Sequence, residues 1–243
     1  MSSGFYTTYL GMQARQDAMD VLANNLANVS TTGFKGDSAF FRAYQNALDD
    51  DPTDNTNIDR STNLENTKTD FSPGSMHNTG RELDAAIDGE GFFVVQTSAG
   101  ERYTRDGSFT LNSNGQLVTH DGFTVTGRSG PITLPPGVVS IDPAGNISVD
   151  GASVDTLKVV KFAQPATLAK EGRNLFRQTD PKGAALTIEN PNIQQGALEG
   201  SNVNAIHEMV TMMKYMREFE SLQKMLTSMS NDTNGSTMGK INT

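Results

Sequence analysis

The chain has 243 residues, a formal net charge of −9 and a hydrophobic content of 35%. An acidic chain without clusters of Lys and Arg does not fit nucleic-acid binding, which needs cations to neutralise phosphates. The absence of cysteine excludes disulfide frameworks and thiolate chemistry, and no stretch approaches the roughly 20 apolar residues of a membrane-spanning helix.

Residues 5–29 have the pattern of an amphipathic helix. Apolar residues recur at seven-residue steps, with two further residues between them: Phe5, Met12, Met19, Leu26, then Leu22 and Val29. A strict seven-residue stripe is typical of a coiled-coil seam. Gly33 is placed to take the left-handed conformation that ends a helix, with Phe34 folding back on it. No basic region followed by an apolar run opens the chain, so no cleaved signal peptide is expected.

Residues 36–80 are rich in Asp, Asn, Thr and Ser, and we expect a linker that is extended or loosely ordered. Its acidic run, Asp49 to Asp59, lacks the glycine and glutamate spacing of a calcium-binding EF-hand loop. A solvated linker is therefore the preferred interpretation.

Residues 81–185 predict an all-β domain. The apolar run GFFVVQ at 91–96 is typical of a strand, and residues 109–119 predict a hairpin that turns at Asn114-Gly115. Further short apolar segments follow, with turn signals about every ten residues, which favours a sandwich or an open barrel.

Residues 186–201 are expected to be a return linker, and 202–243 a C-terminal helix, capped by Asn202 or Asn204, whose tail frays after Ser230. Apolar residues cover a broad face of this helix in two parallel stripes: Met209, Met212, Met216, Phe219 and Leu226, then Val203, Ile206, Val210 and Met213. The overall prediction is an α+β protein, with terminal helices that pair as a coiled coil around a central β domain. Pairing leaves part of the C-terminal face uncovered, so other copies or other proteins are expected to cover it.

The sequence predicts no catalytic, metal or cofactor site. The three histidines, at positions 77, 120 and 207, stand in separate segments without ligand spacing. The glycine-rich stretch at 88–91 lacks the spacing of a phosphate-binding loop and is interpreted as a tight turn. Arg105-Asp106 has the form of a catalytic pair, but a turn in which the Asp bonds nearby amides is preferred.

Three segments, in order along nearly the whole chain, resemble bacterial flagellar rod and hook proteins. ANNLANVSTTGFK at 23–35 is similar to their N-terminal signature, and GALEGSNVNAIHEMVTMM at 196–213 to their C-terminal signature. LDAAIDGEGFFVVQ at 83–96 and YTRDGSFTLNSNGQLVTHDG at 103–122 resemble their central β region. The length, SSGFYTTYLGM and FESLQKM are most similar to proximal-rod members, with distal-rod members as the alternative.

The resemblance implies a subunit that the flagellar type III apparatus exports without signal cleavage. It implies polymerisation in the periplasm, with other copies and neighbouring rod proteins, into a helical rod that transmits torque to the hook. Its terminal helices are expected in an inner coiled-coil layer. Asn24, Asn25 and Asn28 are then expected to meet polar groups of neighbouring helices and to reject wrong registers, unless they bond within their own subunit.

A secreted β-domain adhesin or binding module is the alternative from a different functional class. In that case the terminal helices serve only export, and the C-terminal helix needs no broad buried face. An enzyme is not expected.

Overall fold

The computed structural model describes residues 3–39, 67–180 and 183–238, with side chains from Phe5 as far as Asn231. The acidic run of the predicted linker therefore lies outside the described residues. The chain divides into two compact units. The helical unit comprises the two terminal helices with residues 37–68, and the β unit comprises residues 28–36 and 69–203.

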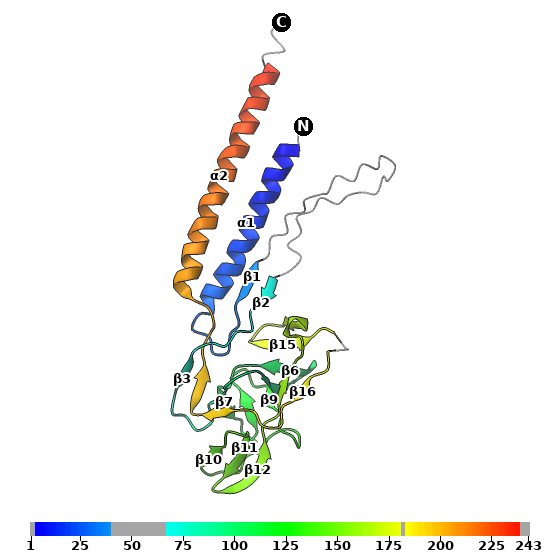
Figure 1. Cartoon of the computed structure of the whole chain (residues 1–243), viewed down its shortest axis with the longest axis vertical. Helices are drawn as coiled ribbons and strands as arrows, with labels where there is room; N and C mark the ends of the chain where they lie inside the picture. Colours follow the sequence, from blue (N-terminus) through cyan, green and yellow to red (C-terminus); the bar gives the residue numbers. More distant parts are fainter. Residues whose placement is uncertain (1–2, 40–66, 181–182, 239–243) are drawn as a thin grey trace, which may run out of the picture. The chain divides into compact units, whose positions relative to one another are not determined.

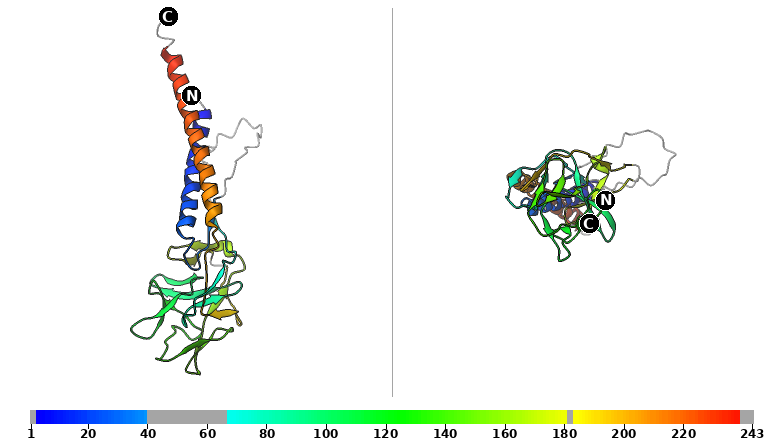
Figure 2. Two further views of the ribbon diagram at one scale, coloured as in Figure 1. Left: turned by 90° about the vertical axis from the view of Figure 1, so that its left-hand side faces the viewer. Right: turned by 90° about the horizontal axis from the view of Figure 1, so that it is seen from below.

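The helical unit is built on an antiparallel pair, α1 (Ser3–Ala27) and α2 (Ala205–Met238). The two helices lie side by side in both views (Figure 1, Figure 2). A short strand β1 (Asp37–Ala39) follows α1 and pairs with β2 (Thr67–Thr69). The predicted pairing of the terminal helices is thus confirmed.

The structure defines both ends of α2 more closely than the sequence does. Asn204, rather than Asn202, caps the helix, since its Oδ1 accepts hydrogen bonds from the amides of Ile206 and His207, both at 3.1 Å. The helix continues past Ser230 to Met238. Once a helix is formed, each added residue gains a backbone hydrogen bond, so poor helix formers are tolerated near its end.

The β unit is entirely antiparallel in its described strand pairs, as the predicted all-β domain requires. Its main sheet has nine strands in the order β14-β15-β6-β5-β9-β8-β7, with β13 beside β5 and β16 beside β13. These strands are β5 (Phe92–Thr97), β6 (Gly100–Thr104), β7 (Phe109–Leu111), β8 (Leu117–Thr119), β9 (Thr124–Val125), β13 (Val159–Lys161), β14 (Leu168–Lys170), β15 (Leu175–Gln178) and β16 (Leu186–Thr187).

A second, three-stranded sheet joins β10 (Val139–Ile141), β11 (Asn146–Val149) and β12 (Ala152–Thr156), and a 3₁₀ turn spans Pro165–Thr167. The predicted hairpin is present as β7 and β8, with Thr110 opposite Val118 and a φ of +72° at Gly115 in the turn. Glycine takes this left-handed conformation without steric cost.

Two hydrophobic cores flank β5, which explains its unbroken apolar run. Phe93 and Val95 enter the first core, with Phe109 and with side chains of the three-stranded sheet such as Ile147. Phe92 and Val94 alternate onto the opposite face and enter the second core, with Phe176 among others. Because both faces of β5 are covered, its sequence has no polar alternation.

Two segments that the sequence predicts as linkers contribute strands to the β unit. Residues 69–80 carry β3 (Met76–Asn78), which pairs with β18 (Ala197–Glu199) of the return segment. In the same way β4 (Ala85–Ile87) pairs with β17 (Ile193–Gln195). The incoming and outgoing chains of the β unit are therefore hydrogen-bonded to each other.

Candidate functional site: the helical faces and the Glu199 cluster

Several of the buried positions on α1 carry small side chains. Ala14 and Ala18 are buried, with Ala18 at 0% exposure, and Thr8 is buried beside them. A Cβ placed on Gly11 would lie 3.5 Å from Cδ1 of Leu222. Small residues allow two helix backbones to approach closely, and these positions are not the large residues of the predicted stripe.

The contacts between the helices follow one antiparallel register. Thr8 donates a hydrogen bond to the sulfur of Met225 at 3.9 Å. One turn further along α1, Gly11 faces Leu222, and one turn further again Nε of Arg15 lies 2.5 Å from Oε2 of Glu218. The Arg15 guanidinium also lies 5.3 Å from the ring centroid of Tyr215. Moving one turn toward the C-terminus of α1 thus brings a partner that lies one turn closer to the N-terminus of α2, as expected for antiparallel helices.

The predicted interface residues divide into half-buried and exposed sets. The half-buried set is Met12, Met19, Leu22, Leu26, Asn28, Val29, Val203, Met212, Phe219 and Leu226. The exposed set is Phe5, Asn24, Ile206, Met209, Val210, Met213 and Met216, and only Asn25 is fully buried among all these predicted residues.

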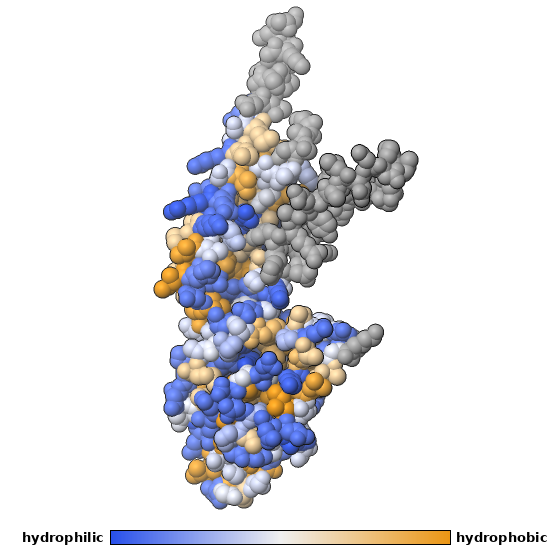
Figure 3. Space-filling view, viewed as in Figure 1, coloured by the Kyte–Doolittle hydropathy of each residue, from blue (hydrophilic) through white to orange (hydrophobic). Residues whose placement is uncertain are grey.

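The exposed residues of this set that belong to α2 form an apolar face along its first turns: Ile206, Met209, Val210, Met213 and Met216. Ile206 is 76% exposed, Val210 56% and Met213 48%. Hydrophobic residues gather over this part of the helix in the space-filling view (Figure 3). Contiguous apolar surface of this kind marks interaction sites on proteins, and the face remains after α1 and α2 have paired.

Asn25 bonds within its own chain, which is the alternative that the sequence left open. Its Nδ2 donates to the carbonyl of Asp37 at 2.8 Å, and its Oδ1 accepts from the amide of Asp37 at 2.9 Å. With 2% exposure and both amide atoms used, Asn25 is not available to a neighbouring helix, so the register role expected of it is corrected. Asn28 also bonds locally, since its Oδ1 accepts from the Thr31 hydroxyl at 3.2 Å.

A buried charged cluster lies where the chain enters and leaves the β unit. We call Lys35, Arg105 and Glu199 the Glu199 cluster; they are 1%, 5% and 2% exposed. Lys35 Nζ lies 2.6 Å from Glu199 Oε1 and also donates to the Ser72 carbonyl at 2.7 Å. Arg105 Nε lies 3.0 Å from Glu199 Oε2, an ionic contact without the alignment of a hydrogen bond.

Glu199 also accepts backbone bonds that extend the cluster. Its Oε1 accepts from the amide of Gly74 at 2.9 Å, and its main-chain carbonyl accepts from the amide of Gly33 at 2.7 Å. Gly33 has a φ of +67°, and a Cβ there would lie 2.4 Å from the backbone nitrogen of Asp106. Three separate segments, those of Lys35, Gly74 and Arg105, are therefore tied to Glu199.

Burial changes the pKa values of the two cations in this cluster. Desolvation lowers the pKa of Lys35, and the hydrogen bond and charge of Glu199 oppose that shift. Desolvation likewise lowers the pKa of Arg105, against the charges of Glu199 and Glu90. Each cation is buried together with the carboxylate that keeps it charged, which makes the three residues interdependent.

Sequence reasoning missed the Glu199 cluster, although each of its residues lies in a recognised motif. Lys35, Arg105 and Glu199 each stand next to or near a glycine, in GFKG, YTRDG and ALEG. A charged residue beside glycine in each of these motifs is the feature of the sequence that could have indicated the cluster. The turn interpretation of Asp106 is confirmed, since its Oδ1 accepts from the amide and the hydroxyl of Ser108 at 3.0 and 2.7 Å.

A metal-binding cluster and a membrane-spanning helix are both absent from the described residues. They contain no group of three or more His, Asp or Glu side chains placed to hold a metal ion. Among the helices described, none is long and apolar enough to cross a membrane.

Three family models match the chain in sequence order. Residues 5–35 match the flagella basal body rod protein model, residues 86–149 the D1 domain of flagellar hook protein FlgE/F/G, and residues 194–233 the C-terminal model of flagellar basal body rod FlgEFG proteins. The flagellar basal-body rod protein FlgF of Caulobacter vibrioides is 34% identical to this chain, over 100% of both chains.

The chain belongs to the flagellar basal-body rod protein family. FlgF of Salmonella typhimurium is 35% identical, over 94% of each chain, and FlgG of Bacillus subtilis is 32% identical, over 94% of this chain and 95% of the relative. Membership places the chain among the structural rod proteins of the bacterial flagellum, in the basal body. The resemblance seen in the sequence is thus confirmed.

Proposed function

We propose that this chain is a non-catalytic subunit of the flagellar rod that polymerises through its terminal helices into a helical tube. The tube transmits torque from the motor to the hook. One observation carries the proposal: the apolar face of α2 stays exposed after α1 has paired with it, with Val210 56% exposed. Burying one large apolar side chain stabilises an assembly by about 1.5–3 kcal/mol.

The spacing of the half-buried residues supports a coiled-coil arrangement of the pair. On α2 these residues step by three and four along the helix: Ala205, Glu208, Met212, Tyr215, Phe219, Leu222, Leu226 and Met229. On α1, Thr8, Gly11, Arg15, Ala18, Leu22 and Asn25 follow the same spacing. Such spacing is typical of a coiled-coil seam, and Val210 and Met213 lie outside it with more than half and about half of their surface exposed.

The Glu199 cluster has a mechanical role in this proposal. Residues 28–36 and 196–203 are two of the chain segments through which load from the helices enters the β unit. Lys35 and Glu199 join these two segments inside the β unit, with 2.6 Å between their charged atoms. Arg105 joins both to the main sheet through the end of β6. The Lys35–Glu199 ion pair therefore lets the segments 28–36 and 196–203 carry torque together.

The proposed partners are other copies of the chain and neighbouring rod proteins, with the flagellar type III apparatus as the export route to the periplasm. No nucleic acid is among them. Similarity to FlgF and FlgG relatives fits both proximal-rod and distal-rod positions, and we favour the proximal rod on the N-terminal and FESLQKM segments.

The test places charge on the exposed face of α2. In the double variant Val210→Glu, Met213→Glu, burial of two carboxylates in an apolar interface costs several kcal/mol, so basal bodies with a complete rod should fall by about 100-fold or more. The matched control is Ser221→Glu, Ser228→Glu, which adds the same charge at exposed polar positions of the same helix. Secretion into the periplasm should stay normal in both. Complete rods and normal swimming in the first variant would contradict the proposal.

A further inference from the structure

The chain passes between its two compact units at four points, after residues 27, 36, 68 and 203. Three of these passages have a residue of the same hydrogen-bonded network beside them. Gly36 is the last residue of its stretch in the β unit, while Asp70 and Asn202 each stand one residue inside the stretch 69–203. Load that reaches the β unit along the chain must go through such passages, so bonds between them decide whether they move together.

The side chain of Asn202 uses both its acceptor and its donors on the other two passages. Its Oδ1 accepts from the amide of Gly36 at 2.8 Å. Its Nδ2 donates to the carbonyl of Asp70 at 2.8 Å, and to the carbonyl and the hydroxyl of Ser72 at 3.3 and 3.2 Å. The main-chain amide of Asn202 donates to the carbonyl of Phe34 at 3.4 Å. A short side chain with one acceptor and two donors is needed here, and asparagine has that set.

The first two passages also bond directly to each other. The amide of Asp70 donates to the carbonyl of Gly36 at 2.8 Å. The Asp70 carboxylate accepts from the amide and the hydroxyl of Ser72 at 2.9 and 3.0 Å. The Ser72 carbonyl, which accepts from Asn202, also accepts from Lys35 Nζ at 2.7 Å. The network therefore joins the three passages in a closed loop and continues into the Glu199 cluster.

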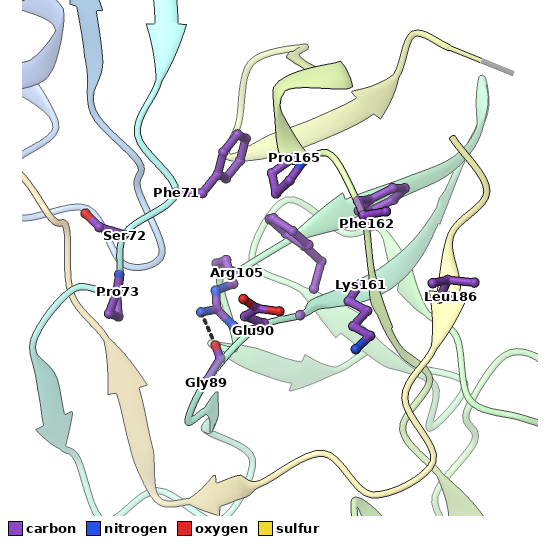
Figure 4. A pocket seen from close by; sticks show the side chains of 13 residues that line it. Phe71, Ser72, Pro73, Gly89, Glu90, Arg105, Lys161, Phe162, Pro165 and Leu186 are labelled. Carbon is purple, nitrogen blue, oxygen red and sulfur yellow. Dashed lines mark hydrogen bonds between the residues drawn. The ribbon is translucent and has the colours of Figure 1, made fainter. Parts of the chain in front are cut away.

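Phe71 anchors one of these passages in the second core of the β unit. The side chains of Phe71 and Ser72 point to opposite sides of their segment (Figure 4). The Phe71 ring packs against Phe92 and Phe176, at centroid distances of 5.7 and 5.3 Å, whereas Ser72 faces Asn202. The bonds of Asn202 therefore reach a segment that the core already holds.

We propose that Asn202 is a positioning residue that locks three chain passages to one another, so that torque carried by the helices turns them as one body. This inference rests on the proposed transmission of torque by the rod. Without the Asn202 amide, the passages at Gly36 and Asp70 keep one backbone hydrogen bond to each other, and the passage at Asn202 keeps its main-chain bond to Phe34. Each passage can then turn about its own backbone dihedrals.

Hydrogen exchange of single amides, followed by NMR on the unassembled full-length chain, tests the lock. In Asn202→Ala the amide of Gly36 loses its acceptor and should exchange about tenfold faster. The decisive amide is that of Asp70, which bonds to Gly36 and not to Asn202. The lock predicts that it also exchanges about tenfold faster. Unchanged exchange at Asp70 would show that Asn202 only satisfies the amide of Gly36, and would overturn the proposal.

A second variant separates hydrogen bonding from loss of side-chain volume. Asn202→Asp keeps the shape and an acceptor, but it places a carboxylate against the carbonyls of Asp70 and Ser72 in place of two donors. It should speed exchange at Asp70 as Asn202→Ala does, and wild-type protection there would overturn the need for the donors. Loss of protection throughout β5 in either variant would assign Asn202 to the overall stability of the β unit and overturn its local role.

The matched control is Asn192→Ala. Asn192 is an exposed asparagine of the β unit whose Nδ2 donates to Oδ2 of Asp88 at 2.9 Å. Its removal also deletes a side-chain hydrogen bond between distant segments, and it should leave exchange at Gly36 and Asp70 unchanged. Faster exchange there in the control would contradict the assignment of the lock to Asn202.

Motility tests the mechanical consequence. Cells with Asn202→Ala should build a normal number of complete rods but should lose swimming speed in viscous medium, where the load on the rod is larger, while Asn192→Ala swims normally. Unchanged swimming at every viscosity would overturn the role in torque, and absence of rods would assign Asn202 to assembly instead.

The two proposals fail separately. The exchange measurement uses the unassembled chain, so its outcome does not depend on polymerisation. If the double variant on α2 assembles normally, polymerisation through that face is wrong, whatever the exchange result. If Asp70 stays protected in Asn202→Ala, the lock is wrong, and polymerisation through the helices stands.

Discussion

The β unit and the helical unit differ in how they bury apolar side chains. In the β unit, Phe93, Phe109 and Ile147 reach 0% exposure, within two cores that its own strands enclose. In the helical unit, full burial is reached by Ala18, while Ile206 and Val210 stay largely exposed. A unit with complete cores is stable alone, whereas a two-helix pair gains much of its stability from packing against further partners. We therefore expect assembly to bury the exposed apolar residues of the helical unit, whereas the cores of the β unit are already complete.

The largest effect should come from breaking the Glu199 cluster. Glu199→Ala leaves Lys35 and Arg105 buried without their carboxylate, which should lower the free energy of unfolding of the β unit by about 3–5 kcal/mol. Urea unfolding followed by circular dichroism measures this, with the helical and β transitions fitted separately.

The control for this variant is Glu101→Ala, which removes an exposed ion pair with Lys158 at 3.0 Å. Its expected cost is below about 1 kcal/mol. If the two variants lose the same small amount of stability, the Glu199 cluster is not a structural element of the β unit.

A smaller effect is expected from overfilling the contact between the helices. Ala18→Leu adds three carbons at a position with 0% exposure and should destabilise the helical unit by about 1–3 kcal/mol. Ala23→Leu makes the same change at an exposed position of α1 and should be close to neutral. Thermal melting at 222 nm compares the two, and equal melting curves would show that the helices do not pack through Ala18.

The smallest effect should be a gain in stability. Gly11→Ala places a Cβ at ordinary contact distance, 3.5 Å from Leu222, inside a helix, where replacing glycine stabilises by about 0.5–1 kcal/mol. The same change at Gly33 should destabilise, because that residue has a φ of +67° and no room for a Cβ. The melting midpoints of both variants test this, and a loss of stability at Gly11 would contradict the close but unstrained packing described here.

Periodic and turn-forming residues allowed much of the fold to be predicted from the sequence. The heptad spacing predicted both terminal helices, and Asn114-Gly115 predicted the turn of the hairpin that β7 and β8 form. The strands β3, β17 and β18 were missed because each is three residues long and is stabilised by a partner far away in the sequence: β18 pairs with β3, and β17 pairs with β4. Local patterns carry no information about such long-range partners.

The candidate sites also differ in how far the sequence predicts them. An apolar excess on α2 is visible in the sequence, so an uncovered face was predictable. The sequence did not indicate that small residues such as Ala18 are the buried positions of α1, because alanine fits any helix face. Lys35, Arg105 and Glu199 are 164 residues apart at their extremes, and their meeting depends on tertiary structure that single motifs do not encode.

Hydrogen exchange, measured by mass spectrometry on the unassembled chain and on purified rods, tests the central claim most directly. The account predicts that amides of residues 205–231 become at least about 100-fold more protected in the rod, while strands β5 and β6 change little, since their burial is already complete. Equal protection of α2 in both states would contradict the claim that assembly covers its exposed apolar face.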